Sequence, residues 1–121
     1  MEYIYEVPLK FNEQNLDRLV ARLLDLEYRE PDLSKWEKIV STLRGAKEEV
    51  EIAIVGKYIE LKDAYKSLIE ALTHGGIANG IRVKLRWVNA ENFDLKELED
   101  VDGILVPGGF GERGVEGKIK A

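Results

Sequence analysis

The sequence contains no cysteine and only one histidine, His74. Without cysteine, the chain has no disulfide, no thiolate metal ligand and no cysteine nucleophile. A single histidine leaves little for a metal site or for the serine–histidine pair of a hydrolase. We therefore predict that these residues hold no catalytic centre and no metal site of their own.

Positive charge and long apolar runs are also scarce. Lysine and arginine number 18 against 23 aspartates and glutamates, so the net charge is −5, and the basic stripe typical of nucleic-acid binders is missing. No apolar run approaches the ~18 residues of a membrane span. The opening residues, MEYIYEVPLKF, lack the basic and apolar regions of a secretory signal. We expect a soluble, cytoplasmic protein with neither a nucleic-acid nor a membrane partner.

The first third of the chain has the pattern of two helices. Apolar residues recur at helical spacing across residues 16–24 and form one face, and Asn12 stands where it can cap this helix. Pro31 interrupts the pattern, because the residue before a proline disfavours helix. A second apolar stripe runs across residues 33–43 and is followed by Gly45, a residue type that commonly ends helices.

From residue 49 onward, apolar strands alternate with helical patterns. Short apolar runs predict strands at residues 51–55, 81–87 and 101–106. Helical patterns follow at residues 64–72, at residues 95–98 with Asp94 as cap, and from residue 115. The triplet His74-Gly75-Gly76 predicts the end of the first of these helices. This alternation predicts an α/β fold with a partial, open parallel sheet and flanking helices, preceded by a helical linker.

The most specific feature is a glycine-rich segment, residues 106–117 (VPGGFGERGVEG), directly after the last predicted strand. Open α/β sheets bind ligands at this end of their strands. Glycines permit positive φ and leave backbone amides uncovered, and such amides can hold a developing oxyanion. The lysine and hydroxyl residues of a P-loop are missing, and the G-x-G-x-x-G match is a weak signal alone. A turn that only reverses the chain explains the glycines equally well.

Three stretches resemble the CTP synthase family. Residues 55–67 (VGKYIELKDAYKS), followed by His74-Gly75-Gly76, resemble the start of its class I glutamine amidotransferase domain. Residues 106–119 resemble the oxyanion segment of that domain, and residues 4–9 (IYEVPL) resemble the close of the family's synthase domain. The matches occur in the family's order and together extend over nearly the whole chain.

The resemblance implies two parts: residues 1–48 are the end of a synthase domain with a helical interdomain linker, and residues 49–121 are the N-terminal half of a flavodoxin-like amidotransferase domain. The family makes CTP from UTP, ATP and glutamine, with Mg²⁺, and its Cys-His-Glu triad hydrolyses glutamine through a thioester. In that scheme the oxyanion and glutamine-binding loop comprises Gly108, Gly109 and Phe110. The triad and the ATP, UTP and Mg²⁺ sites fall outside this chain, so we expect the isolated chain to be inactive and to bind no cofactor.

Three more residues, Lys66, Arg113 and Glu116, are candidates for contact with GTP, the family's activator, or with the synthase domain. The alternative for Arg113 and Glu116 is an i,i+3 ion pair on a solvated helix start. The resemblance also implies a homotetramer. The competing hypothesis is a noncatalytic flavodoxin-like module that binds a small anion or a partner through the glycine-rich segment.

Overall fold

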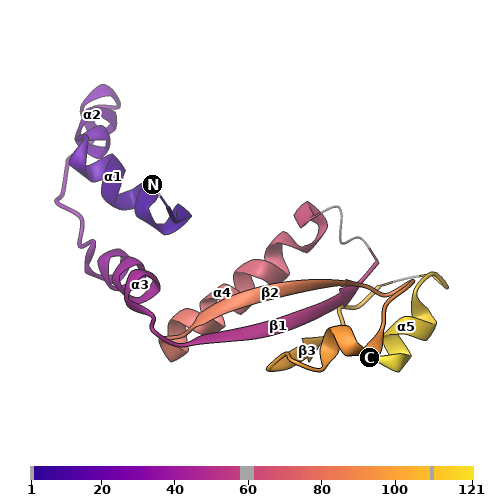
Figure 1. Cartoon of the computed structure of the whole chain (residues 1–121). Coiled ribbons are helices and arrows are strands. Elements are labelled where there is room, and N and C mark those ends of the chain that lie inside the picture. The colour runs from indigo at the N-terminus through magenta and orange to yellow at the C-terminus, as the bar shows by residue number, and fades with distance from the viewer. Residues whose placement is uncertain (1, 58–61, 110) are drawn as a thin grey trace. The chain divides into compact units, whose positions relative to one another are not determined.

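The chain forms two compact units, Met1–Gly45 and Ala46–Ala121 (Figure 1). The structure is a computed structural model that describes residues 2–57, 62–109 and 111–121. The first unit is helical, with η1 (Ile4–Glu6), α1 (Val7–Glu13), α2 (Leu16–Leu23) and α3 (Ser34–Gly45). Its two predicted helices correspond to α2 and α3, and α3 ends at the predicted Gly45.

The predicted cap of α2 is wrong. Asn12 lies inside α1, and its Nδ2 donates to Asp17 Oδ2 at 2.9 Å. The residue that precedes α2 is Asn15, whose left-handed backbone (φ 55°) turns the chain from one helix into the next. Asparagine tolerates this conformation better than most residues. Sequence spacing alone did not show that α1 continues past Asn12.

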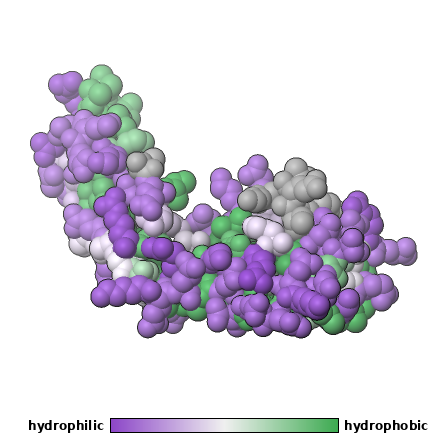
Figure 2. Space-filling view, in the orientation of Figure 1, coloured by the Kyte–Doolittle hydropathy of each residue, from purple (hydrophilic) through white to green (hydrophobic). Residues whose placement is uncertain are grey.

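Apolar side chains of α2 are exposed rather than packed within the first unit. The exposed residues are Leu19, Val20 and Leu23, and Leu24 directly after the helix is exposed as well. Figure 2 shows hydrophobic surface over this helix. Contiguous exposed apolar residues are typical of a surface that contacts further polypeptide.

Among the described residues of the first unit, Glu6 is the one charged residue that is buried, with 4% of its surface exposed. Its Oε1 accepts hydrogen bonds from the backbone amides of Glu2 and Tyr3, both at 3.4 Å, and from Arg44 Nη2 at 3.0 Å. Burial by itself raises the pKa of Glu6, but the backbone amides and the charge of Arg44 together act more strongly in the opposite direction. The pKa of Glu6 therefore lies below its ordinary value of 4.5.

This lowered pKa makes the stability of the first unit depend on pH. The contribution of Glu6 is fully present above pH 4.5, and it is lost as pH falls through the lower pKa of the folded state. We expect thermal unfolding, followed by circular dichroism, to shift to lower temperature below that pH. Glu6→Gln should flatten this acid dependence, whereas Glu13→Gln, at an exposed ion pair with Lys10, should keep it. An unchanged acid profile in Glu6→Gln would contradict the assignment.

The second unit is built on a three-stranded parallel sheet, as the sequence predicted. Its strands are β1 (Glu49–Gly56), β2 (Arg82–Asn89) and β3 (Gly103–Leu105), in the order β2-β1-β3. β1 pairs with β2 along its whole length and with β3 over three residues (Figure 1). The last strand is shorter than the predicted 101–106, so the chain leaves the sheet earlier and the glycine-rich segment begins as loop.

The helical elements of this unit are η2 (Lys62–Tyr65), α4 (Lys66–Asn79), η3 (Leu95–Leu98) and α5 (Val115–Lys120). The predicted Asp94 cap is confirmed, since its Oδ1 accepts from Lys96 N at 3.1 Å. Within the described residues, none of the helices has the length and apolar character needed to cross a membrane.

The predicted helix end at His74-Gly75-Gly76 is wrong, because α4 continues to Asn79 and stops at Gly80, whose φ is 70°. Gly76 is needed for close packing instead. A Cβ atom there would lie 2.8 Å from the carbonyl oxygen of Ile81, directly before β2. Because glycine has no side chain, it permits this close approach of helix to strand. The same residue type also ends helices, and for that reason the sequence pattern alone suggested a helix end here.

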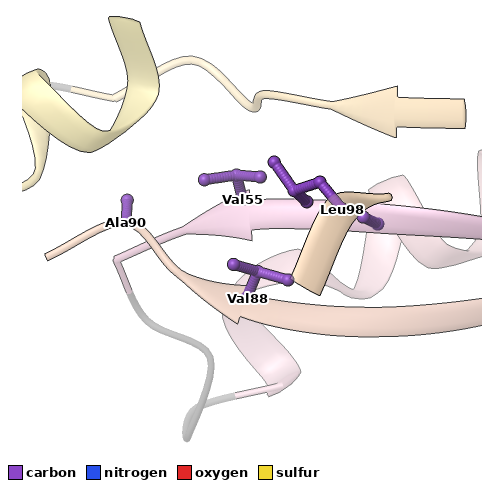
Figure 3. Packing of buried hydrophobic residues seen from close by; sticks show 5 residues of the cluster. Val55, Val88, Ala90 and Leu98 are labelled. Carbon is purple, nitrogen blue, oxygen red and sulfur yellow. The ribbon is translucent and has the colours of Figure 1, made fainter. Parts of the chain in front are cut away.

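The hydrophobic core lies toward the carboxyl end of the sheet. It comprises Ala53, Val55, Val88, Ala90 and Leu98. Val55 and Val88 are register partners on β1 and β2, and Leu98 joins them from η3 (Figure 3). Nearer the amino end of the same face, Glu51 pairs with Arg86 at 2.5 Å and with Lys84 at 3.2 Å. The apolar half of this face therefore supports the loops that leave the strands.

Candidate functional site

The glycine-rich segment follows β3 and runs into α5, so it lies at the carboxyl edge of the parallel sheet. Lys57 follows β1 at this edge, and Glu91 follows β2. Gly108 and Gly109 are exposed there. The loops of all three strands therefore meet where open α/β sheets bind their ligands.

The glycines of this segment have different structural roles. Gly111 and Gly114 adopt left-handed backbone, with φ of 86° and 73°, which other residues rarely adopt. Gly108 and Gly109 lie outside the left-handed region, and a Cβ atom at Gly108 would meet nothing within 4 Å. The fold itself does not require glycine at 108. The absence of a side chain there leaves the main chain open at the surface.

Two lysine side chains border the exposed diglycine. Lys118 Nζ donates to the carbonyl oxygen of Pro107 at 2.9 Å and lies 3.0 Å from the place of a Cβ atom on Gly109. Lys57 Cε lies 3.8 Å from the same place, and its Nζ lies 3.6 Å from the corresponding place on Gly111. Their positive charges favour an anion or a polarised oxygen near the diglycine amides.

Lys118 is not among the residues predicted from the sequence. The sequence does contain a signal for this residue, because side chains on a helix lean toward its N-terminus. A lysine one turn into α5 is therefore directed back over the loop that precedes the helix. The length of α5 and its packing had to be known before this lysine could be selected from the others nearby.

Arg113 ties the glycine-rich segment to the end of β2. Its Nε donates to Glu91 Oε1 at 2.6 Å and its Nη2 donates to Oε2 at 3.0 Å. The Arg113 hydrogen bonds, helped by the charge of Lys57, lower the pKa of Glu91. This ion pair joins residues 22 apart in sequence, whereas the alternative considered above was an i,i+3 pair of Arg113 with Glu116.

Two other predicted site residues, Glu116 and Lys66, lie on different helices. Glu116 is exposed in the first turn of α5, where it lines a groove of about 500 Å³ together with Phe93 and Ile119. Lys66 is exposed at the first residue of α4. Phe110 lies outside the described residues. Across the described parts of the chain, no group of three or more histidine or acidic residues is arranged to hold a metal ion.

Comparison with known proteins agrees with this geometry. The model of the family "Glutamine amidotransferase class-I" matches residues 60–121. The chain is 60% identical over 121 residues to a CTP synthase of Hydrogenobaculum sp. strain Y04AAS1 and 59% identical over 122 residues to one of Aquifex aeolicus. A CTP synthase of Rhodospirillum centenum is 56% identical over 126 residues.

Each of these alignments covers 100% of this chain but only 23% of the relative. The family match takes in α4, two of the strands, the glycine-rich segment and α5, which together form the edge described above. A parallel sheet with an open diglycine at its carboxyl edge and a family match over that same region make this chain a member of the class-I glutamine amidotransferase family.

Proposed function

We propose that this chain is a portion of a CTP synthase and supplies the loop that binds glutamine and its oxyanion in the glutaminase site. The exposed Gly108-Gly109 pair, at the carboxyl edge of a parallel sheet, carries the proposal. The similarity to CTP synthases, which extends over the whole of this chain, supports it. The same relatives disfavour a noncatalytic binding module.

The loop suits a carboxamide substrate for a steric reason and an electrostatic one. Gly108 leaves open space where other residues carry a Cβ atom, so a planar amide can approach the main chain. As negative charge develops on the substrate oxygen, backbone N–H groups fixed in place stabilise it without reorganising. The ammonium groups of Lys57 and Lys118 add positive potential at the same place. In this proposal Phe110 completes the glutamine-binding loop.

The remaining chemistry belongs to polypeptide beyond these 121 residues. The chain has no cysteine, so the nucleophile that forms the thioester would come from elsewhere, and we propose that the isolated chain is inactive. We assign the ATP and Mg²⁺ of the parent enzyme to its synthase domain, as the resemblance to the CTP synthase family implies. Cytoplasmic location, homotetramer formation and activation by GTP are part of the same proposal.

A chimera tests this function directly. In it, residues 1–121 replace the aligned segment of the Hydrogenobaculum CTP synthase, to which they are 60% identical. We expect the chimera to form CTP with glutamine or with ammonia as nitrogen source, at rates comparable to those of the unmodified enzyme. A folded chimera that uses ammonia but does not hydrolyse glutamine would contradict the proposed role of the segment.

Arg113, Glu116 and Lys66 remain candidate contacts with GTP or with the synthase domain. In the chimera, Arg113→Ala should reduce the stimulation of glutamine hydrolysis by GTP about tenfold, the size of one charge-assisted hydrogen bond. Glu91→Gln is the matched control, because it weakens the same ion pair while the arginine charge remains. If both variants lower hydrolysis equally with and without GTP, Arg113 only tethers the loop.

A further inference from the structure

Lys118 joins the two ends of the glycine-rich segment. Its Nζ, on α5, donates to the carbonyl oxygen of Pro107, eleven residues earlier, at 2.9 Å, and the bond is partly buried. Pro107 lies between the end of β3 and the diglycine. The hydrogen bond therefore acts on the peptide group that leads into the proposed oxyanion loop.

That peptide group couples the carbonyl of Pro107 to the amide of Gly108. None of the peptide bonds among the described residues is cis, and in a trans peptide the C=O and N–H groups point in opposite directions. A carbonyl oxygen held toward Lys118 consequently turns the Gly108 N–H to the opposite side of the loop. Loss of the hydrogen bond would free this peptide plane to rotate.

The position of Lys118 is itself fixed by tight packing. The neighbouring residue, Gly117, approaches Ala90 so closely that a Cβ atom on it would lie 1.8 Å from the Ala90 carbonyl oxygen. Ala90 belongs to the buried core. The backbone of α5 is therefore held against the end of β2, and the lysine extends from a rigid support, as precise placement of a functional group requires.

We infer that Lys118 is a positioning residue of the glutaminase site, which holds the Pro107–Gly108 peptide with the Gly108 amide turned toward the substrate carboxamide. This inference rests on the proposed function. A Gly108 amide fixed in this direction stabilises the developing oxyanion more than the neutral carboxamide, so loss of the hydrogen bond lowers kcat more than it changes KM.

The test uses Lys118→Met, Lys118→Arg and Lys120→Met in the chimera. Lys118→Met keeps the length of the side chain and removes its charge and donors. We expect kcat for glutamine hydrolysis to fall about 10- to 100-fold, with KM changed less than about threefold. Lys118→Arg should recover most of the activity, since arginine also donates from a long cationic side chain. Ammonia-dependent CTP formation should stay unchanged in all three variants.

Lys120→Met is the matched control, because it removes the same charge from the same helix. The ammonium group of Lys120 lies over the ring of Phe93. Lys120→Met should hydrolyse glutamine like the unsubstituted chimera. Full activity in Lys118→Met, an equal loss in Lys120→Met, or a rise in KM with kcat unchanged would each overturn the inference. Failure of the unsubstituted chimera to hydrolyse glutamine would instead reject the proposed function, and the two failures are thereby distinguished.

Discussion

Gly109→Val in the chimera should lower glutamine-dependent CTP formation about 10²- to 10³-fold, the effect of losing one oxyanion-hole donor. A branched side chain at this position begins 3.0 Å from Lys118 Nζ and covers main chain that is now open. The lysine terminus is flexible and can move aside, so the fold should survive the change. Ammonia-dependent CTP formation, measured in the same preparation, should remain at the level of the unsubstituted chimera.

The control for this variant is Gly75→Val, at an exposed glycine of α4 where a Cβ atom would meet nothing within 4 Å. It adds the same side chain away from the glycine-rich segment and should keep glutamine hydrolysis. If Gly109→Val hydrolyses glutamine as fast as Gly75→Val, the diglycine does not face the substrate. A parallel loss of the ammonia-dependent reaction would point to unfolding rather than to a blocked site.

Gly117→Ala should destabilise the second unit by about 3 kcal/mol, the upper range of measured overpacking effects. The added Cβ atom would lie 1.8 Å from the carbonyl oxygen of Ala90. The Ala90 oxygen is a backbone atom and the position of a Cβ atom is fixed by its own backbone, so no side-chain rotation relieves the clash, and α5 has to move away from the end of β2. Urea unfolding of the chimera measures the effect, and glutamine hydrolysis should fall as well because α5 carries Lys118.

Gly108→Ala is the matched substitution for this stability measurement, since its Cβ atom would meet nothing within 4 Å and its backbone is not left-handed. It should unfold at nearly the same urea concentration as the unsubstituted chimera. Equal midpoints for Gly117→Ala and Gly108→Ala would show that the approach of α5 to Ala90 is looser than the structure indicates. Comparing the two variants thus distinguishes a glycine that is needed for packing from a glycine that leaves the surface open.

The wrong predictions share one cause. Asn12 was expected to cap a helix and Gly75-Gly76 to end one, because both residue types favour those places locally. In the structure the side chain of Asn12 bonds to Asp17, and Gly76 meets the first residues after α4 at close range. In each case a contact outside the local pattern decided the role of the residue.

In the second unit, the alternation of strands and helices along the chain, the parallel sheet and the place of the glycine-rich segment followed from the sequence by itself. These features depend on short-range properties: apolar runs, helical periodicity and the connection lengths of α/β units. The resemblance to the family likewise lies in contiguous residues, and the family match confirmed it.

Only the tertiary structure decided how the segment is held. Glu91 binds Arg113 across 22 residues, Ala90 admits only glycine at position 117, and Lys118 reaches back to Pro107. None of these pairs follows from residue type or spacing alone, because each depends on how α5 and the segment before it lie against the ends of β2 and β3. Chain folding brings those ends together, and the distances between them are a property of packing rather than of pattern.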